Sequence, residues 1–136
     1  MIKDITCVVG GIIVDKDKIL IAQRSSKKDH ALKWEFPGGK VHLNENITEA
    51  LTREIKEELS IDIKKYKFLL DYTFEYKNLK KVHLYFYKIE YYIGKIRNIE
   101  HNKLIWSNLN DLKKFDFLDG DRMIVERILN SNILEL

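Results

Sequence analysis

The sequence of 136 residues contains a single cysteine, Cys7, and a single proline, Pro37. One cysteine excludes an intrachain disulfide and a cysteine-based zinc site. Because Cys7 lies in a strand-like apolar run, we expect a small buried thiol there. No apolar run approaches the ~20 residues of a membrane-spanning helix, and residues 1–9 lack the basic start and apolar core of a signal peptide. A cytoplasmic location without a membrane partner is therefore expected.

The net charge is also small, at +3 near neutral pH. This excess is too small to indicate a nucleic-acid partner. The charges are nevertheless unevenly distributed, since five glutamates stand against two basic residues between Glu45 and Glu58 in an otherwise basic chain. An acidic cluster can hold divalent cations, and basic surroundings suit a polyanionic ligand.

The length fits one domain, residues 1–136, and 45% apolar residues are typical of an ordered soluble protein. β-branched or alternating apolar residues predict strands at Ile5–Val14, Ile19–Gln23, Lys33–Phe36, Tyr66–Tyr76, Lys81–Ile93 and Lys103–Trp106. Helical spacing predicts helices at Ile47–Leu59 and Arg122–Asn130, with a weak one at Leu109–Phe115. Strands before and after one central helix, followed by a last helix, predict an α/β (α+β) fold with a mixed sheet and a helix on each face.

The predicted helix Ile47–Leu59 carries acidic residues on its apolar side. Asn46, followed three places later by Glu49, predicts a capping box at its start. At 100° per residue, Glu54 and Glu58 fall inside the apolar stripe and Glu57 falls at its edge, whereas Glu49 lies on the solvent side. A solvated charged face, the usual origin of such a run, does not place carboxylates there.

Carboxylates that point toward a core are costly unless they are paired or bind a cation. Glu54, Glu57 and Glu58 are spaced i, i+3 and i+4, so they form one cluster with mutual repulsion. Arg53 relieves part of this repulsion through an i, i+4 contact with Glu57. A hard dication with oxygen ligands, Mg²⁺ or its substitute Mn²⁺, is predicted to supply the remaining positive charge.

The spacing of these residues resembles the Nudix box, the signature of the Nudix hydrolases. Eight positions match it at the right distances: Gly39, Glu45, Arg53, Glu54, Ile55, Glu57, Glu58 and Ile61. The lead-in Glu35–Lys40 and the strand order resemble the MutT branch of the family, so the resemblance covers nearly the whole chain. It implies a Nudix-type α/β/α sandwich.

One position departs from the signature, because Ser60 stands where the family has glycine. That glycine follows the helix, where a left-handed conformation is often required. Serine there is expected to cost ~1 kcal/mol of stability. It removes no metal ligand, so catalysis is not affected.

The resemblance also implies roles for individual residues. The metal ligands are Glu54, Glu57, Glu58 and the carbonyl of Gly39, with Glu54, Glu57 and Arg53 in the catalytic set. Arg53 and Glu45 form the pair that orients helix and loop, and Lys40 reaches a phosphate. Metals that bridge phosphate oxygens neutralise developing charge and activate a water for in-line attack. Either Glu54 or Glu100 takes the proton.

Three further residues lie outside the signature, and each has two interpretations. Glu100 is a metal ligand or base by resemblance, or an ordinary surface glutamate. Arg24 contacts the nucleotide, or is a solvated arginine at a strand end. Asp121 reads the base, caps the last helix, or does both. An ionised aspartate only accepts hydrogen bonds, so the residue at this position changes which base edge fits. The four histidines have no ligand-like spacing and are assigned no role.

The leading hypothesis is Mg²⁺-dependent hydrolysis of a nucleoside triphosphate, including oxidised forms such as 8-oxo-dGTP, to a monophosphate and pyrophosphate in nucleotide-pool sanitation. The alternatives within the family are CTP or dCTP, nucleotide sugars, dinucleoside polyphosphates and RNA 5′ ends. A non-catalytic nucleotide-binding module is a distant alternative, since all three helix acids are present. The sequence leaves a monomer and a homodimer open.

Overall fold

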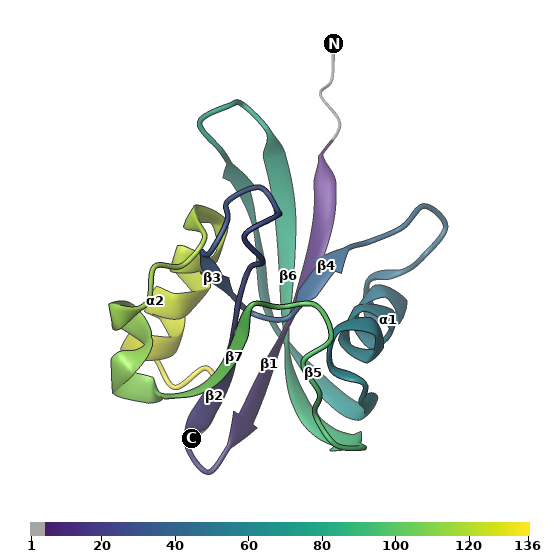
Figure 1. The fold of residues 1–136 in the computed structure, drawn as a ribbon, viewed down its shortest axis with the longest axis vertical. Helices are drawn as coiled ribbons and strands as arrows, with labels where there is room; N and C mark the ends of the chain where they lie inside the picture. Colours follow the sequence, from purple (N-terminus) through teal and green to yellow (C-terminus); the bar gives the residue numbers. More distant parts are fainter. Residues whose placement is uncertain (1–4) are drawn as a thin grey trace.

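The computed structural model describes residues 5–136, and its elements form a mixed sheet between two helices (Figure 1). In chain order the elements are β1 Thr6–Asp15, β2 Lys18–Gln23, β3 Trp34–Glu35, β4 Gly38–Lys40, α1 Ile47–Leu59, β5 Asp62–Glu75, β6 Lys81–Ile93, β7 Lys103–Asn108, the 3₁₀ turns η1 Leu109–Lys114 and η2 Asp119–Asp121, and α2 Arg122–Asn130. No helix in this part of the chain combines the length and apolarity that crossing a bilayer demands. The predicted α/β/α architecture with a mixed sheet is confirmed.

Strand β1 organises the sheet, whose order is β3-β2-β1-β6-β5. It pairs in parallel with β6 from Thr6 opposite Val82 onward. Its first half also pairs antiparallel with β4, whereas only its end pairs with β2, at Val14 opposite Ile19. Strand β2 pairs with β7 along its whole length, from Lys18 to Gln23, and its far end also pairs with β3, at Ala22 and Gln23. The first half of β1 and the far end of β2 therefore belong to separate parts of the sheet.

Two apolar cores lie on opposite faces of these strands. One joins sheet residues such as Ile12 and Phe86 to Ile124 of α2, and the other joins Val9 of β1 to Leu51 of α1. The alternating residues Val82, Leu84 and Phe86 of β6 are buried in the α2-side core. The helices accordingly cover opposite faces of the sheet (Figure 1).

The adjacent glycines Gly10 and Gly11 in β1 allow a close approach of neighbouring side chains. A Cβ atom on Gly11 would lie 2.6 Å from Cδ1 of Ile89 and 3.2 Å from Cδ1 of Ile55 in α1. On the other face, a Cβ on Gly10 would lie 2.8 Å from the Phe86 ring. Both cores therefore pack directly on this part of β1.

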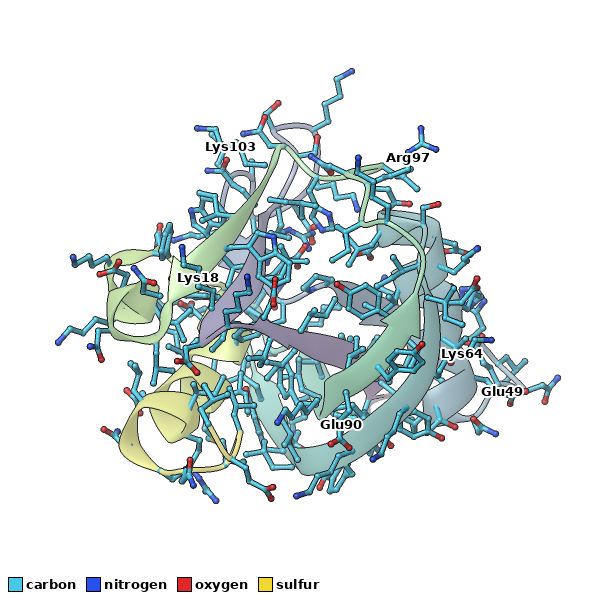
Figure 2. The ribbon with its side chains drawn as sticks, turned by 90° about the horizontal axis from the view of Figure 1, so that it is seen from below. Lys18, Glu49, Lys64, Glu90, Arg97 and Lys103 are labelled. Carbon is cyan, nitrogen blue, oxygen red and sulfur yellow. The ribbon has the colours of Figure 1, made fainter. Side chains whose placement is uncertain are left out.

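Helix α1 has the predicted bounds and the predicted capping box. The Asn46 side chain accepts from the Glu49 amide at 2.8 Å, and the Glu49 carboxylate accepts from the Asn46 amide at 3.0 Å. Glu58 is buried, as the helical phase predicts, whereas Glu57, predicted at the edge of the apolar stripe, is exposed. Glu49, predicted on the solvent side, projects away from the molecule (Figure 2).

Several expectations for the local structure were wrong. The segment Leu109–Phe115 forms 3₁₀ turns ending at Lys114 rather than an α-helix. Gly38–Lys40, where the sequence predicts no strand, pairs with β1 as β4, because its backbone groups remain free to bond despite the preceding proline. Cys7 is only half-buried, because the first three residues of β1 precede the fully buried stretch that begins at Val9.

Ser60 adopts the left-handed conformation that its position after α1 predicts, with φ 62° and ψ 31°. Its amide donates to the Lys56 carbonyl at 3.0 Å, so the strained residue closes the helix end. Replacing Ser60 with glycine should raise the free energy of unfolding by about 1 kcal/mol, because glycine adopts this conformation without a Cβ clash. Urea denaturation measures the change.

Ser131 provides the matched control, since it ends α2 in an extended conformation, φ −148°, and donates its hydroxyl to the Arg127 carbonyl. Ser131→Gly should therefore lower stability. Equal effects of the two substitutions would contradict the assignment of strain to Ser60.

Candidate active site

The acidic face of α1 is held in place by the guanidinium of Arg53. Its Nε and Nη2 donate to the two carboxylate oxygens of Glu45 at 2.7 and 2.9 Å, a bidentate pair. Nη1 donates to Glu54 at 2.9 Å and to Glu57 at 3.3 Å, which is the i, i+4 contact expected from the sequence. Nη2 also donates to the Lys40 carbonyl at 2.9 Å. One cation thus connects α1, the loop after β4 and the end of β4.

This arrangement changes the ionisation of the residues that Arg53 contacts. Hydrogen bonds from Arg53 and from the His42 amide lower the pKa of Glu45 to about 2. The same contacts, above all that with Glu45, raise the pKa of Arg53. Glu45 is therefore an ionised anchor for the guanidinium at any physiological pH.

Glu58 is the deepest of the three helix acids, with a side chain only 6% exposed. Its Oε1 accepts from the Gly38 amide at 3.2 Å. Burial, followed by the negative charges of Glu35 and Glu54, raises the pKa of Glu58 to about 10. Carboxylates so close together are stable in the charged form only if a cation joins them.

Two glycines of β4 let the backbone approach these acids. Gly38 has φ +153°, and a Cβ there would lie 1.9 Å from the Val9 carbonyl oxygen. A Cβ on Gly39 would lie 2.5 Å from the Glu54 carboxyl carbon. A side chain at either position would therefore displace β1 or the carboxylate.

A cavity of about 590 Å³ opens above the acids and runs toward α2. At one end its lining includes Gly39, Lys40, Glu54, Glu57, Glu58 and Glu100. At the other end it includes Phe36, Leu84, Phe86, Leu118, Asp121 and Tyr76. The cavity lies where the first half of β1 separates from β2 and β3, and it combines an acidic end with an aromatic end.

Asp121 is the buried polar group of the aromatic end. It occupies the N-cap position of α2, yet its side chain makes no capping hydrogen bond. Instead Oδ2 accepts from the Phe36 amide at 3.2 Å. Complete burial, reinforced by the charge of Glu35, raises the pKa of Asp121 to about 8. The predicted capping role is therefore wrong, whereas the side chain does line the cavity.

Arg24 also lines the cavity, and it is not the solvated strand-end residue of the second interpretation. Its side chain is only 17% exposed. It donates to Glu35 Oε1 at 3.0 Å, to Asp29 Oδ1 at 2.6 Å and to the Asp29 carbonyl at 2.9 Å. These contacts fix the guanidinium between the loop after β2 and strand β3.

Glu100 and Lys40 have more exposed positions on the acidic side. Glu100 is 40% exposed and lies 3.9 Å from the Lys28 ammonium, so this loop acid borders the cavity without a close partner. Lys40 is exposed at the end of β4 and contributes its carbonyl to Arg53. Both residues border the space next to the helix acids.

Two residues of the site had no predicted role. Glu35 accepts from Arg24 and adds its negative charge to the surroundings of both Glu58 and Asp121. His101 has a side chain only 4% exposed, with Nε2 lying 3.4 Å from Glu35 and 3.4 Å from Glu58. Neither has a local sequence signal, because their partners are distant along the chain.

The donor set fits a hard divalent cation, since it consists of several carboxylates. Within residues 5–136, no three acidic, histidine or cysteine side chains are close enough together to coordinate one metal ion. Arg53 and the Gly38 amide occupy part of their oxygens instead. The raised pKa of Glu58 reflects its burial and the negative charges of Glu35 and Glu54 beside it.

Comparison with known proteins assigns this arrangement to a family. The family model described as NUDIX domain matches residues 6–128. The chain belongs to the Nudix family. An 8-oxo-dGTP diphosphatase from Buchnera aphidicola (subsp. Schizaphis graminum) is 42% identical over 120 residues, covering 88% of this chain and 90% of the relative. The CTP pyrophosphohydrolase of Escherichia coli K12 is 31% identical over 122 residues, covering 90% of each.

The fold agrees with this assignment. A MutT Nudix hydrolase from Burkholderia pseudomallei superimposes with a TM-score of 0.83 at 27% identity, covering 91% of this chain and 98% of that one. This Nudix protein is a pyrophosphohydrolase of the MutT-like type. Nudix hydrolases generally depend on a divalent metal, which agrees with the donor set described above.

Substituting Arg53 with lysine should lower kcat by roughly 100-fold, the effect expected of a misplacement of about 1 Å. An ammonium cannot bind Glu45 bidentately while also contacting Glu54, Glu57 and the Lys40 carbonyl. Steady-state kinetics with circular dichroism as a fold check measures the effect. Arg122→Lys, in an exposed ion pair with Asp116 and Asp119, is the control that should remain fully active.

Proposed function

We propose that this Nudix hydrolase cleaves a nucleoside triphosphate to a nucleoside monophosphate and pyrophosphate with Mg²⁺, or Mn²⁺ in its place. The observation that carries the proposal is the two-ended cavity, acidic beside α1 and aromatic with a buried carboxyl beside α2. The acidic end suits the metal-bound phosphates, and the aromatic end suits a base. A volume of about 590 Å³ is appropriate for a single nucleotide.

The metal ligands in this proposal are Glu54, Glu57, Glu58, the Gly39 carbonyl and Glu100. When bound, the metal supplies charge neutralisation at the phosphate oxygens and a water activated for attack on phosphorus. Arg53 orients Glu54 and Glu57 through its observed contacts, with Glu45 as its anchor. Lys40, exposed at the cavity edge, attracts a phosphate.

Two carboxylates are candidates for accepting the proton of the attacking water. Glu54 is 13% exposed and accepts a hydrogen bond from Arg53. Glu100 is 40% exposed and belongs to a loop rather than to α1. Replacing each by glutamine and comparing the pH dependence of kcat identifies the base, because only its loss removes the acidic limb.

The preferred substrate in this proposal is an oxidised purine triphosphate such as 8-oxo-dGTP, removed from the nucleotide pool of the cytoplasm. Support comes from the 42% identical relative that carries that activity in its name. CTP or dCTP is the second candidate, supported by the 31% identical CTP pyrophosphohydrolase. At neutral pH the protonated carboxyl group of Asp121 can both donate a hydrogen bond to the base and accept one from it, as the amide of an asparagine would.

A panel of 8-oxo-dGTP, dGTP, CTP and dCTP with Mg²⁺ tests the function, with pyrophosphate and phosphate release measured separately. The protein should release pyrophosphate, and Glu57→Gln should lower kcat by about 10³-fold or more without loss of fold, since it removes a metal-binding charge. Glu49→Gln, at the exposed start of α1, is the matched control. No pyrophosphate from any triphosphate would refute the proposal.

Base binding should depend on pH through Asp121. Because burial raises its pKa to about 8, the donating, protonated form is present below pH 8 and is lost above it. KM for the preferred triphosphate should therefore rise as pH increases from 7 to 9. In Asp121→Asn, which keeps a donor at every pH, KM should stay constant over this interval. Parallel KM profiles of the two proteins would contradict a protonated Asp121.

A further inference from the structure

His101 is buried within the acidic site, although no position of the Nudix signature accounts for it. Its Nε2 lies 3.4 Å from Glu58 Oε1 and 3.4 Å from Glu35 Oε2, and its side chain is only 4% exposed. Both neighbours of Nε2 are acceptors, so the ring nitrogen that faces them is the one that carries a proton. Its Nδ1 is buried without a hydrogen-bond partner among the described residues.

The loop around His101 fixes where the ring points. Asn98 accepts from the His101 amide and donates to the His101 carbonyl, both at 2.9 Å. The Ile99 amide donates to the Glu58 carbonyl at 3.1 Å, and the Asn102 amide donates to the Gln23 carbonyl at 2.9 Å. The loop is thereby tied to α1 on one side and to β2 on the other.

The ring lies between two carboxylates of the site, Glu35 and Glu58. Glu35 Oε1 accepts a hydrogen bond from Arg24, and Glu35 Oε2 lies next to His101 Nε2. Glu58 Oε1 accepts a hydrogen bond from the Gly38 amide, and this oxygen also lies next to His101 Nε2. A continuous polar chain therefore runs from Arg24 through Glu35 and His101 to Glu58.

We propose that His101 is a positioning residue whose Nε2–H holds Glu58 in the orientation that binds the divalent metal, and holds Glu35 against Arg24. This inference rests on the proposed metal-dependent function and adds a residue to it. A donor behind a ligating carboxylate restricts its rotamers, and partners of this kind typically contribute 10–100-fold to metal affinity.

Three substitutions separate the position of the donor from the volume of the ring. Gln places an amide N–H near the site of Nε2, Asn places one near the site of Nδ1, and Leu places none. The dissociation constant for Mn²⁺, without nucleotide, is measured by electron paramagnetic resonance of the free ion. This readout does not require turnover, and circular dichroism verifies each fold.

His101→Gln should bind Mn²⁺ within about threefold of the unsubstituted protein, whereas His101→Asn and His101→Leu should bind it at least tenfold more weakly. His83→Leu is the control, because His83 bonds to Asp71 and Thr73 on β5, away from the cavity lining. Its Mn²⁺ affinity should be unchanged.

Unchanged or tighter Mn²⁺ binding by His101→Leu would overturn the proposal, as would equal losses in the Gln, Asn and Leu variants. Should His101→Leu fail to fold, the comparison of Gln with Asn decides the same question. Failure of the proposed function is distinguishable, because it shows as absent pyrophosphate release by the unsubstituted protein, whatever the order of Mn²⁺ affinities.

Discussion

The contact between one guanidinium and three glutamates is the constraint on which the site depends. Arg53 donates to Glu45, Glu54 and Glu57, and also to the backbone of Lys40. Like charges on one helix face repel, so α1 could not present its acids to the cavity without such a cation. The planar fork is essential, because Arg53 makes five hydrogen bonds, whereas an ammonium has only three donors and no fork that matches a carboxylate. The same contacts join α1 to β4 and so fix the cavity floor.

Each end of the cavity contains a buried carboxyl group, and the energetic cost of that burial is relieved differently at each end. Glu58 beside α1 and Asp121 beside α2 are both buried, and burial raises the pKa of each well above its ordinary value. At the acidic end several carboxylates lie together, which favours a metal cation. At the aromatic end Asp121 stands alone beside apolar side chains, which favours a proton. Glu35 lies between them and adds negative charge to both.

The sequence predicts the parts of this site that depend on local spacing. The burial of Glu58 follows from helical phase, and the left-handed conformation of Ser60 follows from its place after α1. Strand β4 was missed because Pro-Gly-Gly is a turn signal, whereas its pairing depends on β1. Glu35 and His101 could not be predicted, because they meet Glu58 only after three distant segments pack together. Contacts of this kind leave no periodic pattern in the sequence.

The most direct test of the metal-centred account is a crystal structure with Mn²⁺ and a nucleoside triphosphate analogue whose α–β bridge is a methylene group. The account predicts anomalous density beside Glu54, Glu57, Glu58 and the Gly39 carbonyl, with the phosphates at this end and the base beside Asp121. Mn²⁺ bound away from these carboxylates, or a base stacked at the acidic end, would contradict it.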